Sequence, residues 1–379
     1  MASITHSNQV ATAPRFSLGR AILWALAVLG VVTIVMRLMY GLGGISNMSN
    51  GVSWGFWIGH KLTGVFSGGA AFTLCAAVYI FGYEKYRPLL RPAILTGLLC
   101  YIMFIILLFF DLGRPERIWH LMIYWNVHSP LFEVGWCVMI YTSVLIVEFL
   151  PILFEKFHWH KAIHALHKIT LPLMVLGVLL STLHQSSLGS LMLAEVGKVN
   201  PLWHTWLIPP FFFITAISGG ISFLILEEAL RCHVYKQPFR IDILSRFSKV
   251  VPWVLGLYLV LRFGDLAFSG EMGLLFTSGI NSVMFWVDVL LSAAIPMVLF
   301  AIPSVRNSAA GLRWSALTVF IGTMIYRFNV SLTGWSRPEG TNYFPHWAEI
   351  GMSVGVVAMV LLAYDFVVRN FAVHTTPEH

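Results

Sequence analysis

The sequence has few charged residues and few cysteines. Asp, Glu, Lys and Arg together make up only 11% of the 379 residues, whereas 58% are hydrophobic. A soluble domain of this size needs a much more charged surface, so the composition excludes one and indicates an all-α protein of membrane-crossing helices. The four cysteines include no CxxC pair. We therefore expect no iron–sulfur cluster or zinc site held by this chain.

Ten apolar stretches are each long enough to cross a bilayer, which takes about 20 residues. We expect spans at 21–40, 54–81, 92–112, 130–151, 169–187, 206–229, 250–270, 281–303, 313–333 and 346–370. Most loop lysines and arginines fall on alternate connections; the other connections carry only Arg114, Arg117, Lys198 and Arg337. The positive-inside rule then predicts that both termini are cytoplasmic. The net charge of +7 is a topology signal that needs no nucleic acid partner.

Short motifs recur in the same order at offsets of about 150 residues. Trp54-Gly-Phe-Trp57 followed by Ser67-Gly-Gly69 matches Trp203-His-Thr-Trp206 followed by Ser218-Gly-Gly220. The order predicts two duplicated four-helix bundles, and the small residues predict close helix packing. The expected organisation is an N-terminal tail 1–19, a first helix 20–40, a first bundle 53–190, a second bundle 203–334, a last helix 345–370 and a C-terminal tail 371–379.

Ionisable side chains inside the spans are the strongest functional signal, because they are costly in hydrocarbon and mark ion paths, proton relays or ligand sites. The first unit carries His60, Lys61, Asp111, Glu133 and His184, and the second carries Arg262, Asp265, Asp288 and Arg327. The first set suits proton-coupled chemistry near neutral pH. The second set suits permanent charge pairing.

The external connection 111–133 is rich in Trp, Tyr and His. Aromatic faces beside polar groups such as His128 and Glu133 suit a flat quinone ring with two carbonyls. An aromatic belt at the membrane surface explains the aromatic residues alone equally well. A bis-histidine haem needs two facing histidines, and only His60 and His184 lie clearly within spans, so we do not expect haem b.

Another group of histidines lies on a basic stretch on the cytoplasmic side. We interpret this stretch as an interfacial helix and not as a metal site, because no carboxylate or cysteine joins the histidines. Its members are His158, His160, His164 and His167.

Four segments resemble the NrfD/polysulfide-reductase membrane subunit family. They are Gly51–Gly59, Asp111–Pro115, His128–Val134 and His184–Gly189. The similarity extends over roughly residues 21–370 and is greatest to the HybB-like branch, which holds the membrane subunit of periplasmic nickel–iron hydrogenases. It implies a subunit that reacts with menaquinone or ubiquinone and holds no metal itself. The implied partners are the lipid bilayer, a periplasmic ferredoxin-like iron–sulfur subunit and a catalytic subunit of nickel–iron hydrogenase, molybdopterin or multihaem type. The implied location is the bacterial inner membrane, with the quinone site toward the periplasm.

The matching motifs place the quinone site at specific residues. These are His60, Lys61, Asp111, His128, Glu133, His184 and Gln185. A candidate proton path or charge network comprises Glu148, Arg262, Asp265, Asp288 and Arg327, although we see no continuous chain of titratable groups in the middle third of the membrane. Two alternatives remain: a secondary transporter, which duplicated bundles also fit, and a passive membrane anchor, which leaves the buried charges unexplained.

Overall fold

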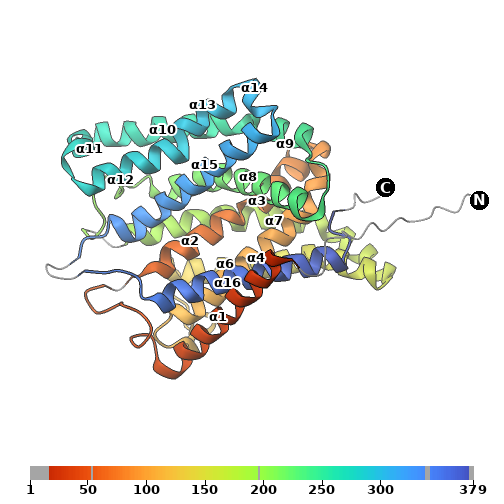
Figure 1. Ribbon diagram of the computed structural model, residues 1–379, viewed down its shortest axis with the longest axis horizontal. Coiled ribbons are helices and arrows are strands. Elements are labelled where there is room, and N and C mark those ends of the chain that lie inside the picture. Colours follow the sequence, from red (N-terminus) through yellow and green to blue (C-terminus); the bar gives the residue numbers. More distant parts are fainter. Residues whose placement is uncertain (1–16, 53, 195–196, 338–341, 375–379) are drawn as a thin grey trace, which may run out of the picture.

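The computed structural model describes residues 17–52, 54–194, 197–337 and 342–374, and these are arranged almost entirely as helices (Figure 1). Ten helical stretches are long and apolar enough to cross a membrane. They are Leu18–Tyr40, Phe56–Ile80, Glu84–Asp111, Pro130–Lys156, His160–Leu193, Ile208–Tyr235, Ile241–Phe268, Ile280–Ala301, Ala309–Thr333 and Trp347–Asn370. All ten predicted spans are confirmed, with shifted ends. The chain is a multi-pass integral membrane protein. Most of the tail predicted for 1–19, and residues 375–379 of the other tail, lie outside the described residues.

Several spans consist of more than one helical segment. The first half contains α1 (Leu18–Tyr40), α2 (Phe56–Ser67), α3 (Gly69–Cys75), η1 (Ala76–Ile80), η2 (Glu84–Leu89), α4 (Leu90–Asp111), η3 (Pro115–Arg117), α5 (His120–Ile123), α6 (Pro130–Lys156) and α7 (His160–Leu193). The second half contains α8 (Ile208–Tyr235), α9 (Ile241–Phe247), η4 (Ser248–Val250), α10 (Val251–Phe268), η5 (Glu271–Gly273), α11 (Leu274–Thr277), α12 (Ile280–Val289), η6 (Leu290–Ala294), α13 (Ile295–Ala301), α14 (Pro303–Arg306), α15 (Ala309–Phe328), η7 (Asn329–Thr333) and α16 (Trp347–Asn370).

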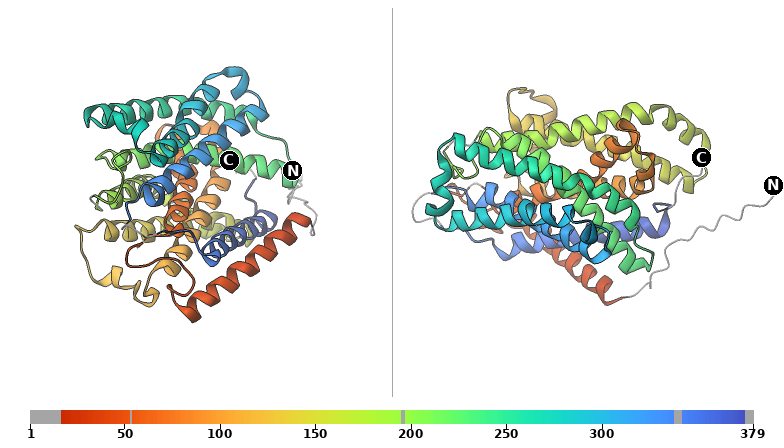
Figure 2. Two further views of the ribbon diagram at one scale, coloured as in Figure 1. Left: turned by 60° about the vertical axis from the view of Figure 1, so that its left-hand side comes forward. Right: turned by 90° about the horizontal axis from the view of Figure 1, so that it is seen from above.

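The fifth span differs from its predicted form. We expected a separate interfacial helix before a span beginning at residue 169, but α7 runs unbroken from His160 to Leu193 (Figure 2). The polar histidines His160, His164 and His167 therefore lie on the first two turns of a membrane helix, which extends beyond the apolar stretch. The expectation of a separate helix was wrong because helix propensity continues across the polarity change.

The helices form two packed groups. In the first group α2, α3, α4, α6 and α7 pack against one another; in the second, α8, α10, α12, α13 and α15 do so (Figure 1). Helix α1 packs along α16. An ion pair of 3.3 Å between Arg20 near the start of α1 and Asp365 near the end of α16 shows that these two ends lie on one side. We call this side the terminal face. That the groups arose by duplication stays a prediction.

The two groups meet where backbone touches backbone. A Cβ atom on Gly220 of α8 would lie only 2.5 Å from the carbonyl carbon of Gly69 at the start of α3. A Cβ on Gly69 would lie 2.7 Å from the carbonyl oxygen of Ala216. Only glycine permits this approach, so the predicted close packing of the small residues is confirmed. We call the contact between Gly69 and Gly220 the glycine seam.

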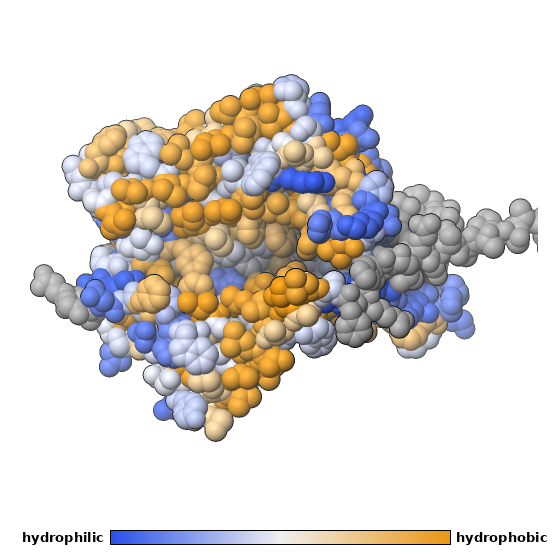
Figure 3. Space-filling model, in the orientation of Figure 1, coloured by the Kyte–Doolittle hydropathy of each residue, from blue (hydrophilic) through white to orange (hydrophobic). Residues whose placement is uncertain are grey.

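The outer surface of the helices is apolar. Figure 3 shows hydrophobic residues across the middle of the visible face and hydrophilic residues gathered toward its ends. Helix α1 exposes a row of large apolar side chains, among them Trp24, Val28 and Val31. This surface suits contact with lipid hydrocarbon.

Candidate functional site

The polar residues of the first group come from four helices. His60 and Lys61 lie on the first turns of α2, Asp111 ends α4, Glu133 lies on the first turn of α6, and His184 lies on α7. All these positions are toward the face opposite the terminal face, because α1 crosses the membrane before α2 begins. Sequence positions that are far apart thus lie in the same half of the first group.

Lys61 and Asp111 form an ion pair between α2 and α4. The Lys61 side chain is 4% exposed and that of Asp111 is 20% exposed. Arg37 of α1 donates to the backbone carbonyls of Phe110 and Leu112, at 2.8 and 2.7 Å. It therefore caps the carbonyl end of α4, where a cation is favourable. The lysine charge has a partner, and the end of α4 is held from two sides.

The His184 imidazole is completely buried. Its ring centroid lies 5.5 Å from that of Tyr101 and 5.8 Å from that of Phe104, and neither ring nitrogen has a hydrogen-bond partner in the part of the chain that the structure describes. Polar groups buried without a partner are rare and costly. The unpartnered nitrogens therefore point to a functional role for this histidine.

Glu133 and Gln185 connect α7 to its neighbours. The Ser187 hydroxyl lies 2.6 Å from Glu133 Oε1 and 2.8 Å from the carbonyl oxygen of Leu183. Gln185 Nε2 donates to the carbonyl oxygen of Val65 on α2, at 3.0 Å. Glu133 is thus positioned through a hydroxyl that can either donate or accept a hydrogen bond.

The other two predicted quinone-site residues, His60 and His128, are less buried than His184. His60 is half-buried, and its Nδ1 finds no hydrogen-bond partner among the residues described. His128 is exposed in the connection before α6, where its backbone N–H donates to Asn126 Oδ1 at 3.3 Å. The structure does not bring His128 into the buried set.

Sequence reasoning missed residues that hold the start of α2. The buried Glu349 of α16 accepts from the backbone N–H of Asn47 at 3.0 Å and from the Tyr343 hydroxyl at 2.5 Å. The Tyr343 oxygen in turn accepts from the N–H of Phe56 at 2.6 Å. Burial and the hydrogen bond to Glu349 raise the pKa of Tyr343 above its usual range. The capping pattern His346-x-x-Glu349 was the available signal.

Sequence reasoning also missed hydroxyl groups in the middle of the first group. Tyr101, Tyr141 and Ser181 are at most 1% exposed. The rings of the two tyrosines lie 4.7 Å apart. By geometric criteria the hydroxyls of Tyr101 and Ser181 have no hydrogen-bond partner among the described residues, although Ser181 lies close enough to both tyrosines to interact with them electrostatically. A tyrosine in an apolar stretch looks like a packing residue, so its hydroxyl gave no separate signal.

The charged residues of the second group do not pair as expected. Among the described residues, Arg262, Arg327, Asp265 and Asp288 form no ion pair with one another. Arg262 donates to the carbonyl of Leu202 at 2.8 Å, and Arg327 to that of Phe212 at 2.9 Å. Asp288 Oδ2 accepts from Trp203 and Asn329, at 2.9 and 2.7 Å, and Asp265 accepts from Thr205 at 2.7 Å. The expected charge pairing was wrong because neutral donors and acceptors hold each group instead.

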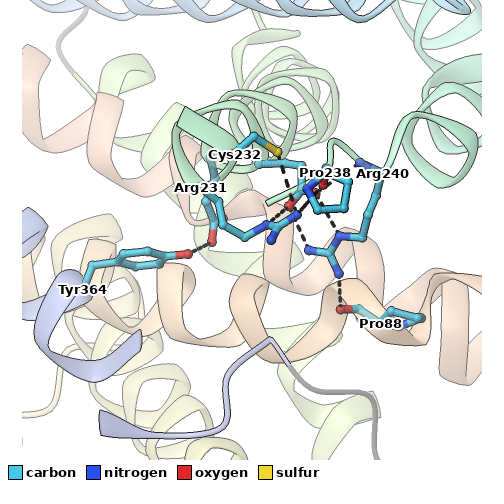
Figure 4. Close-up of polar contacts among 8 residues, drawn as sticks. Pro88, Arg231, Cys232, Pro238, Arg240 and Tyr364 are labelled. Carbon is cyan, nitrogen blue, oxygen red and sulfur yellow. Dashed lines mark hydrogen bonds and ion pairs between the residues drawn. The ribbon is translucent and has the colours of Figure 1, made fainter. Parts of the chain in front are cut away.

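A second polar cluster lies at the terminal face. Glu228 forms ion pairs with Arg231, at 2.6 Å, and with Arg240, at 2.8 Å (Figure 4). The Tyr364 hydroxyl donates to Glu227 at 2.7 Å, and Arg240 donates to the carbonyl of Pro88 at 3.0 Å. The cluster ties the loop after α8 to α16 and to η2. Glu148 of α6 is also buried on this side of the first group. In the part of the chain that the structure describes, no three His, Cys, Asp or Glu side chains are arranged to hold a metal ion.

Known proteins resemble the chain over most of its length. The family model described as "Polysulphide reductase, NrfD" matches residues 44–338. The "Probable Ni/Fe-hydrogenase 2 b-type cytochrome subunit" of Escherichia coli (strain K12) is 36% identical over 91% of this chain and 89% of its own. The "Menaquinone reductase, integral membrane subunit" of Nitratidesulfovibrio vulgaris is 27% identical over 94% and 92%. The "Hdr-like menaquinol oxidoreductase integral membrane subunit" of Archaeoglobus fulgidus is 24% identical over 93% and 92%. With the family model covering well over half of its residues, the chain belongs to the NrfD family.

Proposed function

We propose that the chain is the quinone-reactive membrane subunit of a respiratory oxidoreductase complex in a bacterial inner membrane. It passes electrons between menaquinone or ubiquinone and an iron–sulfur partner subunit at the face opposite the terminal face. A catalytic subunit of nickel–iron hydrogenase, molybdopterin or multihaem type completes the complex. Relatives named for hydrogenase, menaquinone reductase and menaquinol oxidoreductase support this assignment. The observation that carries it is the fully buried His184, in the half of the first group that also holds the half-buried Glu133 and the Lys61–Asp111 ion pair.

The chemistry of a quinone requires such a set. Reduction to the quinol takes two electrons and two protons, one proton for each ring oxygen, so a titratable group must reach the carbonyl oxygens. Glu133 keeps its contact with the Ser187 hydroxyl as a carboxylate or as a carboxylic acid, because the hydroxyl can donate or accept. The His184 nitrogens supply a second donor or acceptor. Glu133 and His184 thus exchange the protons, while Lys61 and Asp111 fix the polar wall beside them.

A haem fits the same residues poorly. One relative is named a b-type cytochrome subunit, and a bis-histidine haem needs two imidazoles with open access to the iron. Tyr101 and Phe104 pack around His184, which is fully buried. This packing argues against a porphyrin at His184, and the proposed electron transfer uses no haem in this chain.

The test is quinone turnover by the purified complex. We expect Glu133→Gln and His184→Ala each to lower turnover strongly while the complex still assembles. Glu116→Gln is the matched control, since this carboxylate is exposed on the connection at the same face. Wild-type turnover in both assembled site variants would refute the proposed site.

We further propose that the protons for this site cross the first group from the terminal face. Glu148 lies near Tyr141, since a Cβ on Gly177 would be 3.3 Å from Glu148 Oε1 and 3.6 Å from Tyr141 Cε2. From Tyr141 the polar groups continue through Ser181 and Tyr101 to His184. Their hydroxyls lie between the two ends of the first group. In this stretch the sequence offers no continuous chain of titratable residues. Proton uptake from the terminal face would make quinone reduction electrogenic.

Proteoliposomes that report proton movement during quinone turnover test this route. We expect Glu148→Gln to reduce proton uptake from the terminal face and to slow turnover. Asp288→Asn, in the second group, should leave both unchanged. If Asp288→Asn abolished proton movement and Glu148→Gln did not, the route would run through the second group instead.

A further inference from the structure

Two arginine side chains are buried in the middle of the second group. Arg262 is 0% and Arg327 is 1% exposed. The Cζ atoms of both guanidinium groups lie near one ring, that of Tyr326, at 5.8 and 5.4 Å from its centroid. Tyr258 lies beside it, with ring centroids 6.2 Å apart. Two permanent cations and two phenol groups therefore lie together in one buried cluster, which we call the compartment.

The charges in this compartment do not balance. Arginine stays protonated in proteins, so neither cation can be removed by losing a proton. Asp288 is the acidic residue buried beside them, and its Oδ2 is occupied by Trp203 and Asn329. Even with Asp288 ionised, the fully buried charges of the compartment sum to +1, and the half-buried Asp265 on α10 is hydrogen-bonded to Thr205. Burying an unpaired charge is among the most costly arrangements in a protein.

Several hydrogen-bond donors in the compartment also have no partner within the described ranges. They are Nε and Nη1 of Arg262, Nη1 of Arg327 and the hydroxyls of Tyr258 and Tyr326. Water could satisfy these donors but would leave the charge. Aromatic rings face the guanidinium groups, and Arg327 Cζ lies 3.6 Å from the centroid of the Phe212 ring. Cation–π contacts of this kind compensate only part of the cost of burying an ion.

The backbone around the compartment is also irregular. A π-helical segment, η6, begins two residues after Asp288, and η7 begins two residues after Arg327. π-helical turns occur frequently at functional sites. A Cβ on Gly322 of α15 would collide with the backbone of Ser292 in η6, so the helices that carry these turns are in direct contact.

We propose that the second group encloses a binding site for one small monovalent inorganic anion, held between Arg262 and Arg327 beside the hydroxyls of Tyr258 and Tyr326. The ligand belongs to the halide class. A quinone is excluded as the occupant because it is neutral and would leave the charge unbalanced. The site does not depend on the proposed quinone chemistry of the first group.

The test measures bound halide and stability, with no need for enzyme turnover. The full-length protein is purified in chloride and transferred to gluconate buffer at equal ionic strength. Halide released on denaturation is then measured by ion chromatography. We expect one halide per chain, and a thermal midpoint that rises saturably when chloride or bromide is restored. Absence of bound halide together with a midpoint indifferent to halide would overturn the proposal.

Variants with opposite expected effects on bromide affinity test whether the halide binds at this site. Arg327→Met makes the compartment neutral and should raise the dissociation constant for bromide roughly tenfold to a hundredfold. Asp288→Asn removes the one negative charge and should tighten bromide binding. Tyr326→Phe keeps the packing and should weaken binding to a smaller degree, which tests the site even if Arg327→Met fails to fold. Unchanged bromide affinity in Tyr326→Phe and Asp288→Asn would exclude the site. Tyrosinate absorption at neutral pH would also exclude it, because an ionised phenol would supply the negative charge in place of the halide.

Discussion

The Ser187 hydroxyl on α7 lies 2.6 Å from Glu133 Oε1 on α6, and this contact fixes the carboxyl group at the end of the first group. Ser187→Ala should remove the positioning but keep the acid. We expect a fall in quinone turnover smaller than that of Glu133→Gln, together with an altered pH profile, because the carboxyl loses a partner worth about 1–3 kcal/mol when buried. Steady-state kinetics across pH would measure this. An unchanged pH profile would show that the hydroxyl only packs.

Variants of the Lys61–Asp111 ion pair should separate its effect on protein stability from its effect on quinone turnover. Lys61→Met leaves a carboxylate without its partner and should destabilise the protein by about 3–5 kcal/mol. The double variant Lys61→Met/Asp111→Asn should recover most of that stability, because no isolated charge remains. If both residues also contact the quinone, the double variant stays inactive despite its stability. Thermal unfolding and turnover of the single and double variants decide this, and restored turnover would assign the pair a structural role alone.

The glycine seam should be sensitive to a single methyl group. Gly220→Ala places a Cβ against backbone atoms of Gly69 and Ala70, which cannot rotate away. We expect destabilisation by about 1–3 kcal/mol. Gly256→Ala is the control, because its Cβ would meet only Met297 Sδ at 3.6 Å. Equal thermal midpoints for the two variants in detergent would contradict the close contact.

The docking of the C-terminal segment that contains His374 should weaken in acid. Burial, together with the charges of Arg231 and Arg240, lowers the pKa of His374 from 6.5 to about 4. The undocked segment therefore binds more protons between these two values, so docking is strongest above about pH 6.5 and weakens as the pH falls toward about 4. Limited proteolysis near the C-terminus should accelerate over this range. His374→Gln should abolish the acceleration; a wild-type rate independent of pH would refute the prediction.

The orientation of the terminal face is open to a direct test. The distribution of Lys and Arg predicts that this face is cytoplasmic. Reporter fusions at Gly43, His120, Lys198 and Arg337 should all read periplasmic. Two cytoplasmic readings among the four would reverse the topology and place the candidate quinone site on the other side of the membrane.

The spans were predictable because hydrocarbon thickness sets their length directly, and apolar runs of sufficient length are visible in the sequence. The extent of α7 was not, since its polar first turns look like a loop or surface helix. The buried site residues were recognised by their charge. Their partners were not, because contacts such as that of Arg262 with the Leu202 carbonyl depend on how distant helices pack. The role of the tyrosine hydroxyls was not predicted, because the packing of the aromatic ring alone explains a tyrosine in an apolar helix.

The glycine seam bears on how the molecule can move. A secondary transporter exposes its site to each side in turn, and many do so by rocking one helical bundle against the other. Here the backbones of α3 and α8 touch at Gly69 and Gly220. Rotation of one group about the other would drive main-chain atoms into each other or open a void between them. The contact between Gly69 and Gly220 therefore opposes rotation of one group against the other. A rocking mechanism of that kind would first have to separate the glycine seam.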